Sequence, residues 1–346
     1  SIGNWAFLGC NNLSYVSITN SVANIGNSAF HGCSSLSSVV IPSSVNSIGD
    51  FAFEDCCGLN TVTIGHNVTT IGYSTFRNCS GIVSVTIPSS VTSIGDRAFY
   101  DCSGLTSVHI NDLEAWCNIE FHTSSNPLVY AKHLFLNGIE IKELTIPNSL
   151  TSIGDEVFCG CSGLSSITIP SSVTKIGNHS FDGCSGLTTV MIPGSVKSIG
   201  YYAFANCNGL TSVTIPSSIF SITEGAFAYC SELTTITIPN SVTTIGQYAF
   251  YDCIGLSKIT IGNGVETIYT HAFANCQELI DVYCFAETVP NMKDGSNTCT
   301  DAFDGSYIEY ATLHVPSSSI NLYKESDPWK NFNTIVKIEM PKHSLT

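Results

Sequence analysis

Charged residues are scarce in this sequence, and basic residues are scarcer still. Only 11% of the 346 residues are charged, and 12 Lys and Arg stand against 27 Asp and Glu, which gives a formal net charge of −15. No cluster of Lys and Arg occurs anywhere along the chain. Because binding to nucleic acid requires a basic surface that neutralises phosphates, the sequence predicts no nucleic-acid partner.

Long hydrophobic segments are also missing. No apolar run approaches the roughly 20 residues that a membrane-spanning helix needs, and no secretory signal opens the chain. Ser1-Ile2-Gly3 aligns with Ser47-Ile48-Gly49, so the chain begins in the middle of the repeat described below. We therefore expect further repeats, a cap or a signal to precede these residues in the full protein, since a solenoid that is cut open exposes its core.

Sequence motifs of enzymes are absent as well. His-Glu-x-x-His, Gly-x-Ser-x-Gly and the phosphate-binding Gly-Lys-Ser/Thr do not occur, and the nine histidines are scattered. Cys159-Gly160-Cys161 lacks the second ligand pair of a zinc site. The segment from Asp294 to Asp301 has oxygen donors at alternate positions but lacks the acidic density and the closing Glu of a calcium loop. The sequence thus predicts no enzyme, no metal site and no cofactor.

What the sequence does contain is a unit of 23 residues that recurs nearly end to end, as in Ser80 to Cys102. A fixed period of this length indicates a solenoid, whose coils bury apolar surface by stacking on their neighbours. Because free cysteine packs as a small apolar residue, the cysteines that recur with the period predict a buried ladder of reduced thiols. These cysteines form two runs with a spacing of 23: Cys10, Cys33, Cys56, Cys79 and Cys102, then Cys161, Cys184, Cys207, Cys230, Cys253 and Cys276.

Each unit predicts two strands and one turn. Residues 59–64 alternate with period two, which is typical of a strand with one buried face, and a proline ends this strand in seven copies. Ser-Val-Thr-x-Ile-Gly then predicts a second, shorter ladder, and the Asp or Asn that follows is suited to capping one helical turn through Ala-Phe. One Phe per unit predicts an aromatic spine inside the solenoid: Phe30, Phe53, Phe76, Phe99, Phe158, Phe181, Phe204, Phe227, Phe250 and Phe273.

Residues 87–105, Ile-Pro-Ser-Ser-Val-Thr-Ser-Ile-Gly-Asp-Arg-Ala-Phe-Tyr-Asp-Cys-Ser-Gly-Leu, resemble the BspA-type leucine-rich repeat of host-associated bacteria. The resemblance extends over residues 1–283. It implies a leucine-rich repeat solenoid, a right-handed coil with a parallel β-sheet on one face and a second short β ladder and single helical turns on the other. Thr223 and Tyr269 depart from the pattern by replacing the Gly after Ile, so the backbone of these two turns is expected to adopt a different conformation.

The period is interrupted once and loosens toward the end of the chain. An irregular insertion at about 103–143 predicts a short capped helix at 112–119 and two short strands joined by Asn-Gly within 133–141. This insertion is either a binding device or a structural variant of the repeat. Residues 284–346 are expected to form a last irregular coil and a C-terminal cap, with strands at 312–316 and 334–338, a helix at 320–324 and an aromatic plug at 328–332.

The outward positions of the main strands are mostly Ser and Thr, which indicates either a soluble surface or a flat binding platform. Candidate binding residues stand where other residue types replace them: Tyr15, Val40, His109, Glu143, Met191, Lys258, Asp281 and Tyr283. The last three come nearest to the patch of adjacent aromatic and charged residues that protein binders present. Outside the ladder, Cys284 and Cys299 are the best candidates for a disulfide, although Cys284 could instead pack in the core.

The resemblance implies a non-enzymatic recognition or adhesion protein, at the cell surface or secreted, that binds a host or microbial protein. We expect the chain to be a monomer. Two alternatives remain open from the residues alone. A neutral face of Ser, Thr and Asn with nearby Tyr and Trp would suit a glycan, and a featureless rod would suit a passive spacer. A fold by itself does not decide among these functions.

Overall fold

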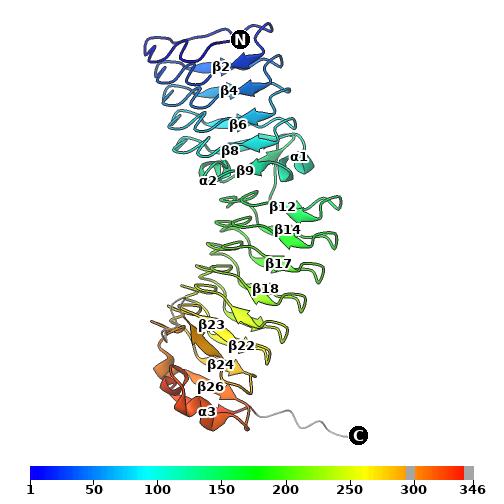
Figure 1. Ribbon diagram of the computed structural model, residues 1–346, viewed down its shortest axis with the longest axis vertical. Helices are drawn as coiled ribbons and strands as arrows, with labels where there is room; N and C mark the ends of the chain where they lie inside the picture. Colours follow the sequence, from blue (N-terminus) through cyan, green and yellow to red (C-terminus); the bar gives the residue numbers. More distant parts are fainter. Residues whose placement is uncertain (294–300, 339–346) are drawn as a thin grey trace. The chain divides into compact units, whose positions relative to one another are not determined.

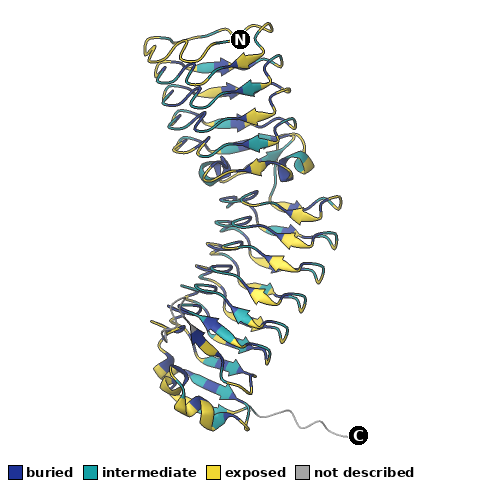
Figure 2. Cartoon of the chain, in the orientation of Figure 1, coloured by how far each residue is buried: buried dark blue, intermediate teal, exposed yellow. Residues whose placement is uncertain are grey.

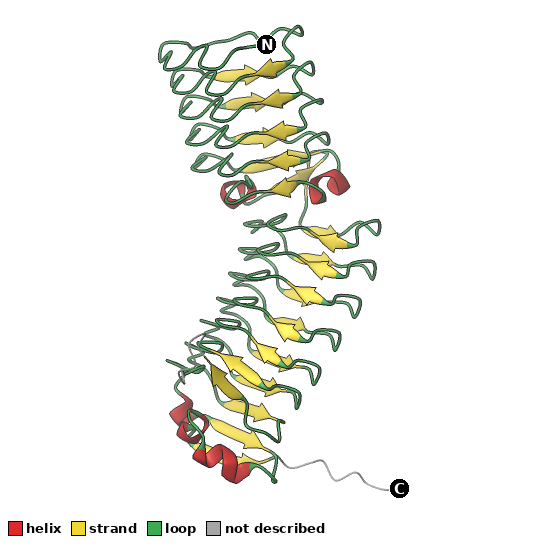
Figure 3. Cartoon of the chain, viewed as in Figure 1, coloured by secondary structure: helices red, strands yellow, loops and turns green. Residues whose placement is uncertain are grey.

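The chain is wound into coils that stack on their neighbours within each of two units, as the 23-residue period predicts. The structure, a computed structural model, describes residues 1–293 and 301–338. It is a parallel β-solenoid of about 13 turns with few helices (Figures 1 and 3). Two compact units make it up: an N-terminal unit of Ser1–Ser165 with His179–Ser185, and a C-terminal unit of Ser166–Asn178 with Gly186–Thr346. The predicted boundary between residues 283 and 284 falls within the C-terminal unit and stays a prediction.

The main strands of the N-terminal unit pair in the order β11-β10-β8-β6-β4-β2. Residues 23 apart are partners, as Val62 is with Val85, so that like side chains stack from coil to coil. Within the three-residue strands β2, β4 and β6 the middle residue is buried and its neighbours are more exposed (Figure 2). The strands are β2 (Ser38–Val40), β4 (Thr61–Thr63), β6 (Ser84–Thr86), β8 (Ser107–Ile110), β10 (Leu134–Leu136), β11 (Ile139–Glu140) and β12 (Glu143–Thr145).

The main strands of the C-terminal unit also pair from coil to coil, with partners 23 residues apart from β20 to β24. β14, β16 and β18 pair in that order, and a five-stranded sheet has the order β20-β22-β24-β26-β27. All of these pairs are parallel. The strands are β14 (Ser166–Thr168), β16 (Thr189–Met191), β18 (Ser212–Thr214), β20 (Thr235–Ile238), β22 (Lys258–Ile261), β24 (Asp281–Cys284), β26 (Thr312–Val315) and β27 (Thr334–Lys337).

The predicted second ladder is present as short strands that each bury one apolar residue, an Ile in most of them, Phe121 in β9 and Met292 in β25. Tyr269, which replaces the usual Gly, extends its strand by one residue and pairs with the next coil, while the Thr223 hydroxyl donates to the carbonyl of Gly200 at 2.8 Å. The strands are β1 (Asn24–Ile25), β3 (Ser47–Ile48), β5 (Thr70–Ile71), β7 (Ser93–Ile94), β9 (Glu120–Phe121), β13 (Ser152–Ile153), β15 (Lys175–Ile176), β17 (Ser198–Ile199), β19 (Ser221–Ile222), β21 (Thr244–Ile245), β23 (Thr267–Tyr269) and β25 (Asn291–Lys293).

The Ala-Phe segments form hydrogen-bonded turns rather than continuous helical turns. In one coil Phe51 and Asp55 have φ of 58° and 61°, and these left-handed residues turn alternate backbone N–H groups toward the next coil. Phe53 N–H, which lies between them, donates to the carbonyl of Thr75 at 2.8 Å. The backbone groups are therefore satisfied between coils, which an isolated helical turn could not achieve.

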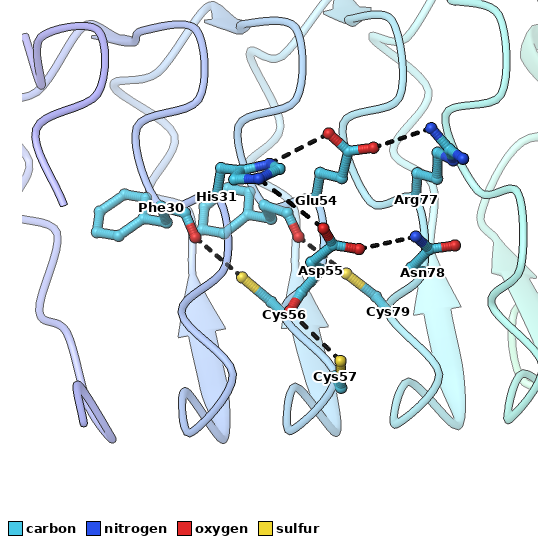
Figure 4. A network of polar contacts seen from close by, with 10 residues as sticks. Phe30, His31, Glu54, Asp55, Cys56, Cys57, Arg77, Asn78 and Cys79 are labelled. Atoms are coloured by element: carbon cyan, nitrogen blue, oxygen red, sulfur yellow. Dashed lines mark hydrogen bonds and ion pairs between the residues drawn. The ribbon is translucent and has the colours of Figure 1, made fainter. Parts of the chain in front are cut away.

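The phenylalanine spine and the cysteine ladder lie directly beneath these turns. Phe30 and Phe53 stack with ring centroids 5.1 Å apart and planes 6° apart, and both are fully buried. The Cys56 thiol donates to the carbonyl of Phe30 at 3.1 Å, and Cys79 does the same for Phe53 at 3.0 Å (Figure 4). These cysteines are free thiols, as predicted.

Polar side chains on three successive turns of the N-terminal unit contact one another. His31 Nδ1 lies 3.1 Å from Glu54 Oε2, and Glu54 Oε1 lies 3.2 Å from Arg77 Nη1 (Figure 4). Next to them the Asn78 amide donates to Asp55 Oδ1 at 2.7 Å. Residues at equivalent positions of neighbouring coils thus pair laterally, and this network belongs to the scaffold.

The insertion is built into the stack. Asp112 caps α1 (Leu113–Cys117) by accepting from Ala115 N–H at 3.0 Å, and Trp116 is buried with its indole N–H donating to the Val157 carbonyl at 3.1 Å. The strand β9 continues the second ladder, α2 (Leu128–Ala131) occupies a turn, and β10 and β11 form the predicted Asn-Gly hairpin. The predicted helix and hairpin are confirmed, and the buried anchors favour the structural-variant interpretation of this segment.

The last coil departs from the repeat, and its role as a C-terminal cap stays a prediction. Ser306 replaces the ladder cysteine, and its hydroxyl accepts from Cys276 N–H at 2.9 Å. The remaining elements are η1 (Ile308–Tyr310), α3 (Ile320–Glu325) and η2 (Trp329–Asn331), and the helices among residues 301–338 cover this end of the unit (Figure 3). Trp329 is fully buried and packs edge-on against Phe303 and Tyr323, which confirms the aromatic plug.

Replacing Gly104 with Ala is expected to lower the free energy of unfolding by about 1–3 kcal/mol, the usual cost of overpacking. A methyl group at this position would collide with the backbone carbonyl of Ser80 in the preceding coil, which cannot move without breaking the stack. The matched control is Gly194→Ala, because nothing lies within 4 Å of a methyl group there. Urea unfolding followed by circular dichroism measures both, and equal midpoints would show that Gly104 is not a contact between coils.

Candidate functional site

The candidate site lies on the outward face of the five-stranded sheet of the C-terminal unit. Because alternate residues of a strand face the same side, two outward rows cross this sheet. The register between strands aligns the first row as Thr235, Lys258, Asp281, Thr312 and Thr334 and the second as Thr237, Thr260, Tyr283, His314 and Val336. Four of these ten residues are ionisable or aromatic, and they are adjacent.

Lys258, Asp281, Tyr283 and His314 form one connected set, which we call the outward cluster. The Lys258 ammonium lies 4.7 Å from the centroid of the Tyr283 ring. On the other side, the His314 ring stacks on Tyr283 with centroids 4.0 Å apart and planes 5° apart. His314 Nε2 lies 2.8 Å from Asp281 Oδ1, which orients the imidazole. Tyr283 is therefore held between a cation and an aromatic ring.

The outward cluster is preorganised for contact with another molecule. Its four side chains rise from the paired strands β22, β24 and β26, whose backbones are fixed by the ladder. Tyr283 is half-buried between its two neighbours, so it would lose little side-chain entropy on binding. Tyr is one of the residue types that contribute most to binding energy at protein interfaces.

The structure brings together the three residues that the sequence singled out as nearest to a patch, Lys258, Asp281 and Tyr283. It does not join the other candidates in the C-terminal unit to them: Met191 stands alone on β16 as an exposed side chain. Tyr15, His109 and Glu143 belong to the N-terminal unit, where Tyr15 is 68% exposed and Glu143 is an exposed residue of β12. Val40 is likewise exposed at the outward end of β2. Their assignment as binding residues stays a prediction.

Sequence reasoning missed two aromatic partners. His314 completes the outward cluster, and Phe135 stacks on His109 with centroids 4.8 Å apart in the N-terminal unit. A signal existed for His314, since it occupies an outward position of a strand that was predicted correctly. The period could not predict that His314 lies beside Tyr283, because 31 residues separate the two instead of 23.

Cysteine chemistry is disfavoured by burial. Burial raises the pKa of Cys161 to about 12 and raises that of Cys159 further, so both thiols stay protonated at neutral pH, which disfavours nucleophilic attack by either. Across residues 1–293 and 301–338, no group of three or more His, Cys, Asp or Glu side chains is placed to hold a metal ion. The possible calcium loop from Asp294 to Asp301 lies almost wholly outside these residues.

The predicted Cys284–Cys299 disulfide stays a prediction, because Cys299 lies outside the described residues. Cys284 occupies the last inward position of β24 and is fully buried. Its sulfur lies 3.1 Å from the hydroxyl of Tyr323, which in turn donates to the Ala286 carbonyl at 2.9 Å. Cys284 thus packs into the core beneath the cap.

No helix within the part of the chain that the structure describes is long and apolar enough to cross a membrane. The longest helix there is α3, which has six residues.

Known proteins share both the repeat and the fold. The model of the family described as BspA type leucine-rich repeat region, six copies, matches residues 1–128, 129–219, 158–280 and 197–326. A leucine-rich repeat protein from Eubacterium ventriosum is 27% identical, with a TM-score of 0.60 over 83% of this chain and 81% of that one. A search among curated proteins found no match to the sequence.

Two further solved structures share the fold alone. A leucine-rich repeat protein from Bacteroides ovatus is 24% identical, with a TM-score of 0.51 over 91% of this chain and 87% of that one. The pneumococcal vaccine antigen PcpA is 19% identical, with a TM-score of 0.53 over 92% of this chain and 72% of that one.

Proposed function

Because this chain belongs to the family of BspA-type leucine-rich repeat proteins, we propose that it is a non-enzymatic recognition protein, displayed at the cell surface or secreted, that binds a protein partner. The observation that carries the proposal is the outward cluster. It places a Tyr, a Lys, a His and an Asp in contact on a sheet whose other outward residues are mostly Thr. Membership of a leucine-rich repeat family supports a role in protein interaction, and the cluster supplies the place.

Binding at the outward cluster would cost little conformational entropy and would bury an aromatic ring. Its side chains are already ordered by the cation–π contact, the ring stack and the 2.8 Å contact to Asp281. A partner that covers Tyr283 would bury an aromatic ring and exclude water from the Lys258 and Asp281 charges. Such central, preorganised residues carry most of the energy of an interface, while the surrounding Thr residues provide a flat rim.

Replacing Lys258, Asp281 and Tyr283 together with Ala is expected to weaken binding to the partner by about 2 kcal/mol or more, which is roughly thirtyfold in Kd. The unfolding midpoint should stay near that of the wild type, because all three side chains lie on the outward face. The measurement is surface plasmon resonance against purified extracellular-matrix proteins. The control variant, Thr235→Ala with Thr237→Ala, changes the same two rows on β20 and should bind as the wild type does. An unchanged Kd in the triple variant would remove this cluster from consideration.

A specific observation favours glycan binding as the second candidate. A polar cavity of about 620 Å³ lies beside the C-terminal ends of β22 and β24, and its lining includes Asn263, Phe285, Glu287 and Asn291. An exposed aromatic ring beside amide and carboxylate side chains offers both a stacking surface and paired hydrogen-bonding groups for sugar hydroxyls. A glycan array separates the two candidates. Binding to glycans that Phe285→Ala abolishes and the triple variant preserves would favour this cavity, and failure of both assays would favour a passive spacer.

A further inference from the structure

Four tyrosines surround a cavity on the turn side of the C-terminal unit. Tyr202, Tyr229, Tyr248 and Tyr251 line a space of about 240 Å³ together with the small side chain of Ala228. They come from the Ala-Phe turns of three successive coils, at positions that most other coils fill with smaller or polar residues. We call these four residues the tyrosine cage. It lies apart from the strands β22, β24 and β26 that carry the outward cluster.

The four rings surround the cavity with edge-to-face contacts and do not form a single parallel stack. Tyr251 meets Tyr229 with centroids 5.4 Å apart at 77°, and meets Tyr248 at the same distance at 89°. The ring of Tyr202 lies over Gly225, where a Cβ atom would collide with it. Gly225 thus makes room for this ring, and Ala228 leaves the space between the rings open. Aromatic faces and edges therefore border the cavity on several sides.

Tyr229 has a strained backbone conformation that a Gly, Asn or Asp at the same position would adopt more easily. Tyr229 directly precedes a ladder cysteine and has a φ of 63°, a left-handed conformation that bulky residues adopt unfavourably. In the other coils this position holds only Gly, Asn or Asp: Gly9, Gly32, Asp55, Asn78, Asp101, Gly160, Gly183, Asn206, Asp252 and Asn275. Strained positions of this kind are concentrated at binding sites. We therefore infer that a Tyr stands at position 229 because its aromatic ring is needed there, and not because the turn requires it.

Two carboxylates and one imidazole lie near the cage, and the imidazole of His271 stacks on Tyr248 with centroids 5.4 Å apart. Burial, followed by the hydrogen bond to Glu224, raises the pKa of Tyr202 to about 12, and burial raises the pKa of Tyr229 as well, so both phenols stay protonated at neutral pH. Tyr202 Oη donates to Glu224 Oε1 at 2.9 Å. The carboxylate of Asp252 acts electrostatically on Tyr229. The three turns, residues 200–207, 223–230 and 246–253, contain no Lys or Arg.

We propose that the tyrosine cage binds a methylated ammonium group, with the rings of Tyr202, Tyr229, Tyr248 and Tyr251 facing the cation. Aromatic rings attract a cation over distances of about 6 Å, and methylation removes the hydration that would compete with the rings. Glu224 and Asp252 add negative potential without occupying the cavity. The group could belong to a choline-type compound or to a trimethylated lysine of a protein, since both present the same trimethylammonium surface.

Isothermal titration calorimetry tests the cage with three probes: tetramethylammonium chloride, choline chloride and a peptide that contains trimethyl-lysine. The uncharged isostere of choline, 3,3-dimethyl-1-butanol, is the control for charge. We expect the ammonium probes to bind and the isostere to bind at least about tenfold more weakly. Tighter binding of the peptide than of choline would identify a protein source, and the reverse would identify a small molecule or headgroup. Equal binding of the isostere, or no binding of any ammonium probe, would overturn the proposal.

Two variants separate the cage from a structural role for its residues. Tyr251→Ala introduces the residue found at Ala205, Ala228 and Ala274, and Tyr229→Asn introduces the residue found at Asn206 and Asn275. Tyr229→Asn should keep the wild-type unfolding midpoint or raise it, whereas Tyr251→Ala should fold with a lower midpoint, because it removes the hydrogen bond from the Asn275 amide. Both should weaken probe binding at least about tenfold. Tyr201→Ala is the control, because this tyrosine is 55% exposed and does not line the cavity. Folded cage variants that bind tetramethylammonium as tightly as the control does would contradict the assignment.

Discussion

Phe99→Ala is expected to lower the free energy of unfolding by about 3–5 kcal/mol, the usual cost of removing a buried Phe. Phe99 is 1% exposed and stacks on Phe76 with centroids 5.3 Å apart. The substitution removes apolar contact area and leaves a cavity, and the ladder hydrogen bonds on either side hold the coils at a fixed spacing, so the cavity cannot collapse fully. Urea unfolding followed by circular dichroism gives the change in free energy.

The control for this experiment is Val83→Ala in the same unit. Val83 is 53% exposed, so its truncation should cost about 0.5 kcal/mol or less. A loss below about 1 kcal/mol for Phe99→Ala would contradict the inward placement of the phenylalanine spine. A loss confined to the coils around Phe99, detected by hydrogen exchange, would show in addition that the stack unfolds in parts.

Raising the pH from 8 to 11 is expected to destabilise the protein strongly through the cysteine ladder. Burial raises the pKa of Cys56, Cys102 and Cys253 from 9.0 to about 12. Above pH 9 the unfolded chain loses these protons while the folded chain keeps them, so the unfolded state binds fewer protons and stability falls with rising pH. The contribution of each thiol is fully present below pH 9 and is lost by about 1.4 kcal/mol per pH unit up to pH 12.

Urea midpoints measured at intervals of pH between 8 and 11 test this expectation. The comparison is the Cys253→Ala variant, which has a lower free energy of unfolding at pH 8. Above pH 9 its free energy of unfolding should fall less steeply than that of the wild type, by about 1.4 kcal/mol per pH unit, because one titrating thiol has been removed. Tyrosine and lysine titrations are common to both proteins and cancel in the difference. Parallel slopes in the two proteins would mean that the ladder thiols do not control the alkaline transition.

The fold could be predicted because its determinants repeat locally. The alternation in residues 59–64 specifies which side chains point inward, and the period of 23 specifies that Val62 pairs with Val85. The same logic located the insertion helix at 113–117 and the Asn-Gly hairpin, since capping and turn signals act over a few residues. The turns were harder, because left-handed residues such as Phe51 become favourable only when a neighbouring coil accepts their hydrogen bonds.

The candidate site could be predicted in part. Lys258, Asp281 and Tyr283 were recognisable as departures from Ser and Thr in regular coils, where the period still gives each residue its neighbour. His314 could not be placed beside Tyr283, because the last coil is longer than the repeat and the sequence has no period there to count by. The tyrosine cage was missed for a related reason. Its members occupy three different positions of the repeat and meet only through the winding of the turns.

By itself, the sequence determined the inward set of Val, Ile, Leu, Phe and Cys, and with it the coil, the register and the family. These features follow from periodicity, and burial of apolar side chains enforces the same solution in every copy. Only the tertiary structure decided which outward residues touch one another. Contacts such as Tyr283 with His314, or Tyr229 with Tyr251, depend on how irregular coils stack and on ring orientations, and no local pattern in the chain encodes either.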